Sequence, residues 1–246
     1  MQHILLTLCA RGGSKGIPGK NIKMIGGKHL IAYSIHHAKS FKKWLEQNNL
    51  ANVKIELSTD STEIIDVCKL YDLKTEYIRS SILANDTAGK QDVIRDLVLF
   101  SEKKNNVKYD LVVDLDVSAP MRTTSDLIEA YTDFYKREGL DVLFSVSEAK
   151  KNPYFNMVEL NEDLTCSISK KPREPILSRQ AAPKVYEMNA SFYFYRRRFF
   201  ENDKMYLFGN ASIYSIKHEC FDLDHQIDFD FLEFLIENNR LNFPIK

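Results

Sequence analysis

The order of apolar and polar residues along the chain predicts strands and helices in alternation. The apolar run at 4–9 is short and continuous, which is typical of a buried strand. Between Leu30 and Leu45, apolar residues recur at spacings of three and four, the period of a helix with one buried face. The same two patterns predict strands at 53–58, 75–78, 109–115 and 142–146, a helix over 91–103, and two helices capped by Ser61 and by Thr124 or Ser125.

This alternation indicates the fold class. Strands that alternate with helices of about ten or more residues form right-handed crossover units around a mostly parallel sheet. We therefore expect an α/β protein. Ligands of such sheets bind at the carboxyl ends of the strands. The loops that follow 4–9, Leu57 and Leu115 should consequently open onto one shared edge.

The pattern changes between Lys150 and Lys184. Four of the seven prolines fall there, at Pro153, Pro172, Pro175 and Pro183. Short alternating stretches at 155–160 and 166–169 predict small antiparallel strands inserted into the domain. The core then resumes with predicted strands at 190–195 and 212–216 and a closing helix at 230–240. We expect a single domain over 1–246 with an inserted arm at 150–180, and a long unstructured insertion is the alternative.

Composition removes several classes of function. The chain has 246 residues, with 34 Lys and Arg against 34 Asp and Glu, so its formal net charge is zero. Proteins that bind nucleic acid through broad electrostatic attraction usually carry a basic excess, so we expect no nucleic-acid partner. The four cysteines lack a C-x-x-C spacing and predict free thiols in a reducing compartment. With no basic leader and no apolar run of membrane-spanning length, we expect a cytoplasmic protein without a membrane partner.

The stretch 10–21 carries the strongest chemical signal. Four of the nine glycines lie in it, at Gly12, Gly13, Gly16 and Gly19. Arg11, Lys15 and Lys20 are interleaved with them, so fixed cations lie beside exposed backbone N–H groups, as in a cradle for polyphosphate. Neither the P-loop spacing nor the dinucleotide fingerprint is present. An ordinary glycine-rich surface loop is the alternative interpretation.

Three pairs of aspartates two residues apart provide candidate metal ligands. They are Asp114 and Asp116, Asp222 and Asp224, and Asp228 and Asp230. On an extended segment both carboxylates of such a pair point to the same side, where they can reach one Mg²⁺ that also holds substrate phosphates. The last pair lies just ahead of a predicted helix, so a helix cap and a first-turn acid are its alternative roles.

The other two pairs differ in position. Asp116 ends a predicted buried strand at the edge where ligands dock. Asp114 lies within that strand, where a structural hydrogen-bond acceptor is an alternative role. We expect Asp222 and Asp224 to be solvated loop acids.

Two arginines follow predicted strands at the same edge. Arg79 and Arg122 could neutralise a phosphate or a sugar carboxylate, although surface arginines without a function are commoner. The run 196–198 is expected to be a solvated turn. The six histidines show no metal-ligand spacing, and no serine lies in a Gly-x-Ser-x-Gly elbow.

Five motifs in order resemble the acylneuraminate cytidylyltransferase family, the CMP-sialic acid synthetases, over nearly the whole chain. They are the loop 10–21, Ser58-Thr59-Asp60, Leu83-Ala84-Asn85-Asp86-Thr87, Ser118-Ala119-Pro120-Met121-Arg122 and Ile227-Asp228-Phe229-Asp230. The resemblance implies a three-layer Rossmann-like nucleotidyltransferase fold. It also implies that CTP reacts with a nine-carbon 2-keto sugar acid to give a CMP-sugar and pyrophosphate. The anomeric hydroxyl would attack the α-phosphorus in line, while the protein contributes positioning and charge neutralisation.

The resemblance further implies the site residues and a partner. Those for CTP are Arg11, Gly12, Gly13, Ser14, Lys15, Lys20, Asn21, Arg79, Asn85 and Asp86. Those for Mg²⁺ are Asp228, Asp230 and Asp116, and the catalytic group is Arg11, Lys20, Asp228 and Asp230. Those for the sugar are Asp116, Ser118, Arg122, Arg179, Gln180, Asn189 and Tyr193. The arm at 150–180 would mediate a homodimer.

Asp116 marks a departure from the family pattern. Sialic acid enzymes tend to have Gln-Pro-Thr-Ser-Pro where this chain has Asp-Val-Ser-Ala-Pro at 116–120, and an aspartate there is a metal ligand in the related KDO cytidylyltransferases. Segments 151–156, 178–183 and 186–191 look most like the subgroup that activates legionaminic acid. The resemblance therefore favours N,N′-diacetyllegionaminic acid, with N-acetylneuraminic acid as the alternative. An Asp-x-Asp glycosyltransferase and a nucleotide sensor without turnover are more distant alternatives.

Overall fold

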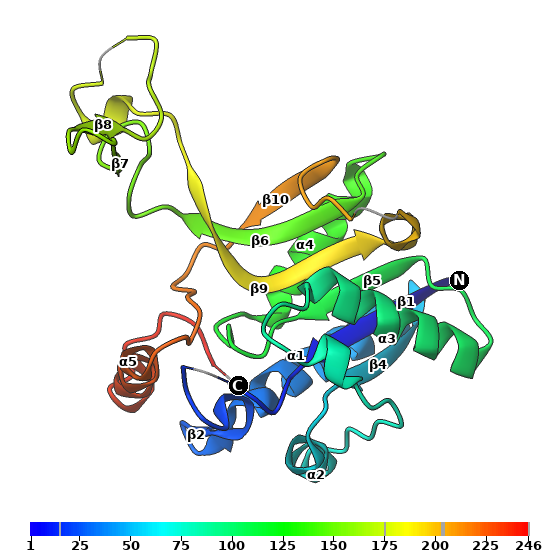
Figure 1. Ribbon diagram of the computed structural model, residues 1–246. Helices are drawn as coiled ribbons and strands as arrows, with labels where there is room; N and C mark the ends of the chain where they lie inside the picture. The colour runs from blue at the N-terminus through cyan, green and yellow to red at the C-terminus, as the bar shows by residue number, and fades with distance from the viewer. Residues whose placement is uncertain (15, 175, 203–204, 246) are drawn as a thin grey trace.

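A six-stranded sheet forms the centre of the protein, in the order β10-β6-β9-β5-β1-β4 (Figure 1). The structure is a computed structural model that describes residues 1–14, 16–174, 176–202 and 205–245. The strands are β1 (Gln2–Cys9), β4 (Ala51–Ser58), β5 (Leu111–Leu115), β6 (Val142–Glu148), β9 (Tyr186–Arg196) and β10 (Ala211–Ser215). Only β9 runs antiparallel to its neighbours β5 and β6 in this sheet. The expected mostly parallel sheet is confirmed.

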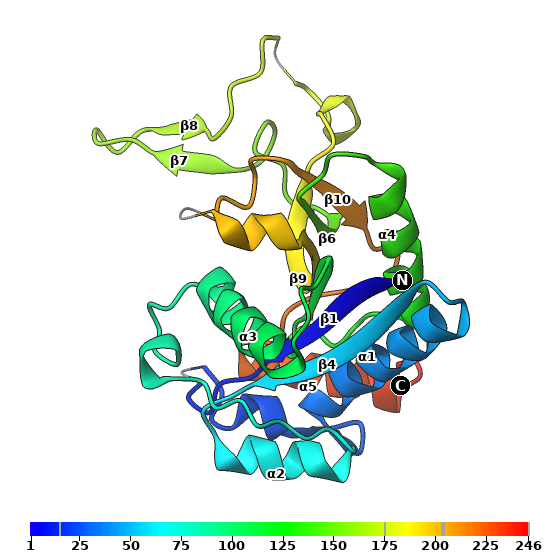
Figure 2. The same cartoon turned by 90° about the vertical axis from the view of Figure 1, so that its right-hand side faces the viewer.

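Helices cover both faces of the sheet, which gives three layers (Figure 2). The first face carries α1 (Leu30–Gln47) and α4 (Thr124–Lys136), and the second carries α3 (Lys90–Asn105). Alternation along β1 explains the division, because Leu6 and Leu8 pack with α1 whereas Leu5 packs with α3. The first core also includes residues of α2 (Thr62–Leu70) and α5 (Gln226–Glu237). The predicted α/β fold class is confirmed.

Shorter elements complete the fold. They are the two-residue strands β2 (Met24–Ile25) and β3 (Lys28–His29) and the 3₁₀ helices η1 (Lys20–Ile22), η2 (Ser81–Leu83), η3 (Arg179–Ala181) and η4 (Arg197–Glu201). Within the part of the chain that the structure describes, none of the helices is both long enough and apolar enough to cross a membrane.

Two of the predicted elements differ from the structure. The fully described stretch 75–78 is not a strand. It is tied to the end of β4 by a side chain instead of a backbone ladder, since the Thr75 hydroxyl donates to the carbonyl of Leu57 at 3.0 Å. The closing helix α5 lies nearer the N-terminus than the predicted 230–240.

The helix caps agree with the sequence in one case and not in the other. Ser61 caps α2, as predicted. The cap of α4 is Thr123, and the prediction of Thr124 or Ser125 is wrong. Thr123 and Asp126 exchange side-chain and backbone hydrogen bonds as a capping box, which satisfies two N–H groups that the first turn leaves unpaired.

The arm is an antiparallel hairpin that projects from the sheet (Figure 1). Its strands β7 (Val158–Leu160) and β8 (Cys166–Ile168) pair with each other in a sheet of their own. The prediction of small antiparallel strands is confirmed, although the first strand is shorter than the stretch 155–160. Of the four prolines in this region, Pro175 lies outside the described residues.

The arginine run after β9 is largely packed against the core. The Arg197 guanidinium donates to both carboxylate oxygens of Glu102 on α3, at 2.7 and 3.0 Å, and its side chain is only 12% exposed. Arg196 lies over the rings of Phe134 and Tyr135. The expectation of a solvated turn is therefore wrong for these two residues.

Arg122 is fully buried and joins three parts of the fold. Its Nε donates to the hydroxyl of Ser191 at 2.9 Å, and its Nη1 donates to the hydroxyl of Ser34 at 3.0 Å. Its Nη2 donates to the carbonyls of Asp116 and Ala119. The guanidinium thus ties α1 and β9 to the loop after β5, and the structure gives this residue a structural role where the sequence predicts a ligand contact.

Replacing Arg122 with methionine should lower the free energy of unfolding by about 3 kcal/mol or more, because the substitution leaves buried carbonyl and hydroxyl groups without their donor. Urea denaturation measures the loss. Arg137→Met is the matched control, since that side chain is 44% exposed and pairs with Asp133 on the helix surface. We expect the control to lose about 1 kcal/mol or less. Equal losses in the two variants would contradict the structural role.

Candidate functional site

A cavity of about 280 Å³ opens at the carboxyl ends of β1 and β5. This is the edge at which open parallel sheets bind ligands. The loops predicted to share one edge meet here. The predicted site residues that line the cavity are Arg11, Ser14, Lys20, Asn21, Arg79, Asn85, Asp86, Asp116 and Ser118.

The glycine-rich loop forms one wall of the cavity and is fastened at both ends. The Asn21 amide donates to the carbonyl of Arg11 at 2.9 Å, and the backbone N–H of Gly12 donates to Asp60 Oδ1 at 2.8 Å. Gly19 has a φ of 63°, a left-handed conformation that glycine adopts without strain, and it leads the chain into η1. These contacts within the protein tie the loop to neighbouring segments.

Gly16 brings this loop into contact with the segment that precedes α5. A Cβ built on Gly16 would lie 2.4 Å from the carbonyl oxygen of Asp224. The position therefore requires glycine because two backbones approach closely there. Lys15, which the sequence places in the same loop, lies outside the described residues.

The cations of the cavity already have partners within the protein. Arg11 Nη1 lies 2.7 Å from Asp86 Oδ1, Lys20 Nζ lies 3.2 Å from Asp224 Oδ1, and Arg79 donates to the hydroxyl and the carbonyl of Ser58 at 2.9 and 2.7 Å. Arg11 and Lys20 are thus paired with carboxylates, whereas Arg79 donates to neutral oxygens of Ser58. A polyphosphate that binds here would exchange carboxylate partners for phosphate oxygens.

Asn85 shapes the wall opposite the loop. Its amide oxygen accepts hydrogen bonds from the backbone N–H groups of Thr87 and Ala88, at 2.9 and 2.8 Å. These bonds close a turn just ahead of α3. Asn85 therefore holds the turn that carries Asp86 into the cavity.

Lys90, the first residue of α3, is a cavity residue that the sequence analysis missed. Its Nζ lies 2.8 Å from Asp114 Oδ2 and 2.5 Å from Asp116 Oδ2. Burial by itself would lower the pKa of Lys90, but the two carboxylates outweigh burial and hold that pKa well above its usual range. Burial opposes ionisation of Asp116 as well, yet Lys90 and Ser118 together lower the pKa of Asp116 to about 2. A lysine at a helix start carries no motif, so only the folded structure reveals the contact.

Asp222 is a second residue that the sequence analysis placed wrongly. One of its carboxylate oxygens is buried and has no hydrogen-bond partner among the described residues. The pKa of Asp222 is raised to about 7, chiefly by burial and in addition by the neighbouring carboxylates of Asp116 and Asp224. The fully buried Leu223 anchors the segment, and its N–H donates to the carbonyl of Ser118 at 2.9 Å. The expectation of a solvated loop acid is wrong for Asp222.

Of the two acids at the start of α5, Asp228 has an alternative role that the sequence allowed, as the first-turn acid of a capping box, whereas Asp230 lies beyond the first turn. Asp228 Oδ2 accepts from the backbone N–H groups of Asp224 and His225, at 2.9 and 2.7 Å, as the acid of a capping box. Asp230 Oδ1 accepts from the side-chain amide of Gln226 at 2.7 Å. The structure therefore directs both expected metal ligands toward protein donors. Asp228 holds in place the backbone of the segment that carries Asp222 and Asp224.

The donor set suits a metal ion that also binds a substrate. Among the described residues, no group of three or more His, Cys, Asp and Glu side chains is placed to hold a metal ion by itself. Mg²⁺ usually takes one or two carboxylates and completes its shell with water and substrate phosphates. The unpaired, buried oxygen of Asp222 beside Asp224 fits that requirement.

The residues expected at the sugar site fall into three locations. Ser118 donates to Asp116 Oδ1 beside the cavity, and Lys90 Nζ lies 4.9 Å from the centre of the Tyr193 ring. Asn189 is buried and exchanges hydrogen bonds with the serines of β6. The remaining two predicted residues are on the arm, in η3 (Arg179–Ala181). The single chain thus brings some of these side chains to the cavity and holds others away from it.

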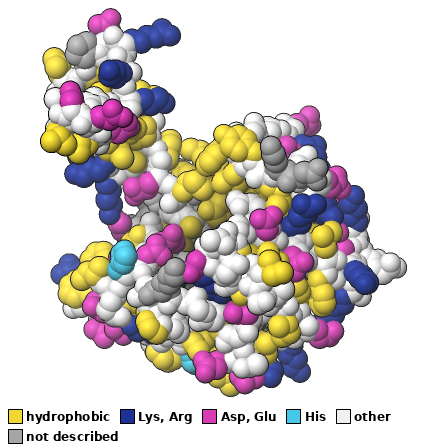
Figure 3. Space-filling model, in the orientation of Figure 1, with side chains coloured by type: hydrophobic (Ala, Val, Ile, Leu, Met, Phe, Trp, Pro, Cys, Tyr) yellow, Lys and Arg dark blue, Asp and Glu magenta, His cyan; other side chains and the backbone are white. Residues whose placement is uncertain are grey.

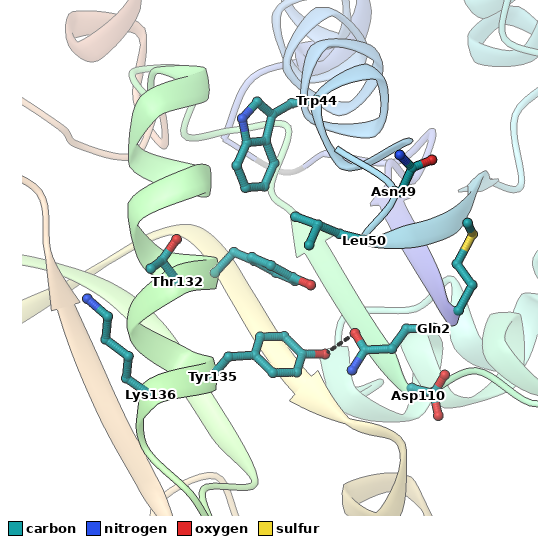
Figure 4. A pocket seen from close by; sticks show the side chains of 10 residues that line it. Gln2, Trp44, Asn49, Leu50, Asp110, Thr132, Tyr135 and Lys136 are labelled. Atoms are coloured by element: carbon teal, nitrogen blue, oxygen red, sulfur yellow. Dashed lines mark hydrogen bonds between the residues drawn. The ribbon is translucent and has the colours of Figure 1, made fainter. Parts of the chain in front are cut away.

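Figure 4 shows a second cavity, of about 830 Å³, at the amino ends of the strands. Trp44, Tyr131 and Tyr135 give it aromatic walls, and the Tyr135 hydroxyl donates to the side chain of Gln2 at 2.7 Å. Lys136 is the one cation among its described lining residues. Although it is larger, this cavity offers no cluster of positive groups for a polyphosphate.

Comparisons with known proteins give the relatives of this chain. The family model described as cytidylyltransferase matches residues 6–243. The post-translational flagellin modification protein B of Campylobacter coli is 38% identical over 242 residues, which are 98% of each chain. The CMP-N,N′-diacetyllegionaminic acid synthase of Campylobacter jejuni is 37% identical over 243 residues, again 98% of each. The solved structure of CMP:2-keto-3-deoxy-manno-octonic acid synthetase complexed with CTP covers 97% of this chain and 100% of its own, with a TM-score of 0.67 at 15% identity, and shows the shared fold.

Replacing Gly16 with alanine should lower the free energy of unfolding by about 1–3 kcal/mol, because the new methyl group would overlap a backbone carbonyl that has no rotamer to escape to. Gly13→Ala is the matched control in the same loop. Nothing lies within 4 Å of a Cβ at Gly13, so we expect a change within about 0.5 kcal/mol. Urea denaturation of both variants measures the difference. If Gly16→Ala were as stable as Gly13→Ala, the loop would not pack against the segment at Asp224.

Proposed function

The chain belongs to the cytidylyltransferase family, and from this premise we propose that it transfers CMP from CTP to a nine-carbon 2-keto sugar acid. The anomeric hydroxyl of the sugar attacks the α-phosphorus, and pyrophosphate leaves. One observation carries the proposal: Arg11, Lys20 and Arg79 gather around one cavity beside the carboxylates of Asp222 and Asp224. A nucleoside triphosphate is a ligand that requires fixed cations and a divalent metal ion together.

Binding of the triphosphate exchanges the partners of the cavity cations. Arg11 leaves Asp86 and Lys20 leaves Asp224, so that each takes a phosphate oxygen instead. Because Asp224 loses an ammonium partner in this exchange, it becomes available to a metal ion. Arg79 keeps its bonds to Ser58 at the end of β4 and borders the cytosine and ribose. The loop contributes the remaining contacts through Gly12, Gly13, Ser14, Lys15 and Asn21.

For the metal ion we propose Asp222 and Asp224 in place of Asp228 and Asp230. Mg²⁺ held there supplies neutralisation of the charge that develops on the leaving pyrophosphate. Asp228 supports the metal site indirectly, because its carboxylate accepts hydrogen bonds from the backbone N–H groups of residues 224 and 225 and so holds that segment in place. Lys20, which lies 3.2 Å from Asp224, would contact the phosphates beside the metal ion, so that fixed charges surround the transferred group.

For the sugar we propose N,N′-diacetyllegionaminic acid. A protein named as the synthase of its CMP derivative is 37% identical to this chain over nearly the full length of both. Relatives named for pseudaminic acid and for N-acylneuraminate are 29% identical, and these sugars are the alternatives. Ser118 and Tyr193, which lie closest to Asp116 and Lys90, are the proposed contacts from the same chain.

We also propose that two chains pair through their arms. The arm leaves Val158, Leu160, Leu164 and Leu177 between 65% and 89% exposed, and Figure 3 shows hydrophobic side chains gathered on it. A two-stranded hairpin is marginally stable alone in water, and apolar groups exposed in this way are typical of an interface. In the dimer, Arg179 and Gln180 in η3 would reach the sugar bound by the other subunit.

The reaction is proposed to take place in the cytoplasm. All four cysteines are free thiols, which is the state that a reducing compartment maintains.

The test is pyrophosphate release with CTP and Mg²⁺, run side by side on N,N′-diacetyllegionaminic acid, pseudaminic acid, N-acetylneuraminic acid and KDO. We expect pyrophosphate release to be fastest with N,N′-diacetyllegionaminic acid and slower with the other two nine-carbon acids. Preference for another nine-carbon acid would keep the chemistry and replace the sugar. No release with any acid, together with consumption of a CMP-sugar, would favour the Asp-x-Asp glycosyltransferase, and CTP binding without release would favour a nucleotide sensor.

A pair of isosteric variants decides which carboxylates carry the metal ion. Asp224→Asn should lower kcat for pyrophosphate release about 100-fold or more, because the amide cannot neutralise the ion. Asp230→Asn should change kcat less than about threefold, since its carboxylate contacts only Gln226 in the described structure. The reverse order of effects would assign the metal ion to the start of α5.

A further inference from the structure

Lys90 occupies the space between two carboxylates at the wall of the cavity. Its Nζ lies 2.8 Å from Asp114 Oδ2 and 2.5 Å from Asp116 Oδ2, and 4.9 Å from the centre of the Tyr193 ring. The lysine side chain is 30% exposed, whereas that of Asp114 is fully buried. The ammonium group therefore stands at the boundary between the core and the cavity, where it pairs with a carboxylate on each side.

In this arrangement Lys90 faces one oxygen of each carboxylate. The buried Asp114 Oδ2 has no hydrogen-bond partner among the described residues, so its ion pair with Lys90 is what compensates its charge. Asp116 Oδ1 accepts from both the N–H and the hydroxyl of Ser118, each at 2.8 Å, and its Oδ2 faces Lys90. Asp114 Oδ1 accepts from the Thr7 hydroxyl at 2.7 Å, and its Oδ2 also faces Lys90. A divalent ion at Asp116 would have to expel the ammonium group, and Asp114 would then lose the partner of a buried charge.

The segment before α5 has the complementary property. Asp222 carries a buried oxygen without a hydrogen-bond partner among the described residues, and the exposed Asp224 is held only at its Oδ1 by Lys20 in the bonds given above. Coordinating capacity is thus concentrated on the segment before α5. The two pairs of carboxylates thus differ in how a lysine holds them: Lys90 lies within 2.8 Å of both Asp114 and Asp116, whereas Lys20 lies 3.2 Å from Asp224.

We propose that Lys90 takes the place of a divalent cation at Asp114 and Asp116, so that the protein binds CTP with one metal ion, on the Asp222–Asp224 side. The inference rests on the proposed function. It gives Asp116 a role other than that of a metal ligand, which the sequence suggests. Lys90 is a positioning residue in this account: it keeps Asp116 in place against Ser118 and excludes a second ion. An ammonium group fixed by the fold supplies positive charge there at any concentration of divalent metal.

The test counts Mn²⁺ ions per protomer by the electron paramagnetic resonance signal of free Mn²⁺, with and without CTP and with no sugar acceptor. The principal variant is Lys90→Met combined with Asp114→Asn, which removes the ammonium and the buried charge together and leaves the net charge of the cluster unchanged. A third substitution, Asp116→Asn, is added to locate any new site. Lys69→Met is the matched control, because Lys69 pairs with Asp66 on the surface of α2. Thermal unfolding confirms that each variant is folded.

The expected result is one Mn²⁺ per protomer with CTP in the wild type and in the control, and two in the double variant. The second ion should disappear when Asp116→Asn is added. Without CTP, the double variant should bind Mn²⁺ about tenfold more tightly than the wild type, because the ammonium group that contacts Asp116 Oδ2 is gone and this oxygen can face the ion. Two ions in the wild type, or one ion in wild type and double variant alike, would overturn the proposal.

The nucleotide-free counts separate this proposal from the proposed function. If calorimetry shows that CTP does not bind to any of the proteins, the proposed function fails. The comparison of Mn²⁺ affinity without CTP still decides whether Lys90 excludes an ion from Asp116. A gain in affinity that depends on Asp116 supports the exclusion, and no gain overturns it.

Discussion

Positive groups that are collected at one edge of a sheet repel one another unless each has a counter-charge, and this constraint determines how the site is built. Arg11, Lys20 and Lys90 come from separate segments of the chain, and each is paired with an aspartate from yet another segment. The ion pairs therefore connect the glycine-rich loop, the start of α3, the end of β5 and the segment before α5. Without these acids, repulsion between the cations would destabilise the folded state at the site.

The same pairs prepare the site for an anionic ligand. In partly exposed pairs such as those of Arg11 and Lys20, the attraction between the partners is weak enough to be exchanged for contacts with phosphate. The pair of Lys90 with the buried Asp114 is different, because separation of these charges would leave one of them in the core without a partner. The cavity thus combines cations that change partners with one cation that stays. The buried Arg122 adds rigidity beneath it, since it fixes the loop that carries Asp116 and Ser118.

Regular periodicity was sufficient to predict the framework, and contacts between distant segments were not predictable from it. The apolar run of β1, the helical spacing of α1 and the glycine-rich loop each depend on neighbours in the sequence, and they appear as expected. The extended stretch 75–78 has the composition of a strand, but it is bound to the end of β4 through the Thr75 hydroxyl and adds no ladder. Composition alone does not distinguish these two outcomes.

The site residues follow the same division. The position of Asp116 at a strand end is visible in the sequence, whereas the burial of Arg122 and Asp222 arises from segments about seventy or more residues away in sequence, which pack over them. An aspartate that precedes a helix can cap it or bind a metal ion, and the pattern is the same for both. For Asp228 only the hydrogen bonds to the backbone at 224 and 225 reveal the capping role.

The central claim is that CTP and a metal ion exchange places with the ion pair of Lys20 and Asp224. The most direct test is the dissociation constant of CTP by calorimetry, for the wild type and Asp224→Asn, in EDTA and in Mg²⁺. In EDTA the variant should bind CTP at least as tightly as the wild type, because the substitution frees Lys20 and removes a negative charge next to the phosphates. In Mg²⁺ it should bind CTP about tenfold or more weakly, because one metal ligand is lost. The same ratio of dissociation constants in both conditions would contradict the exchange.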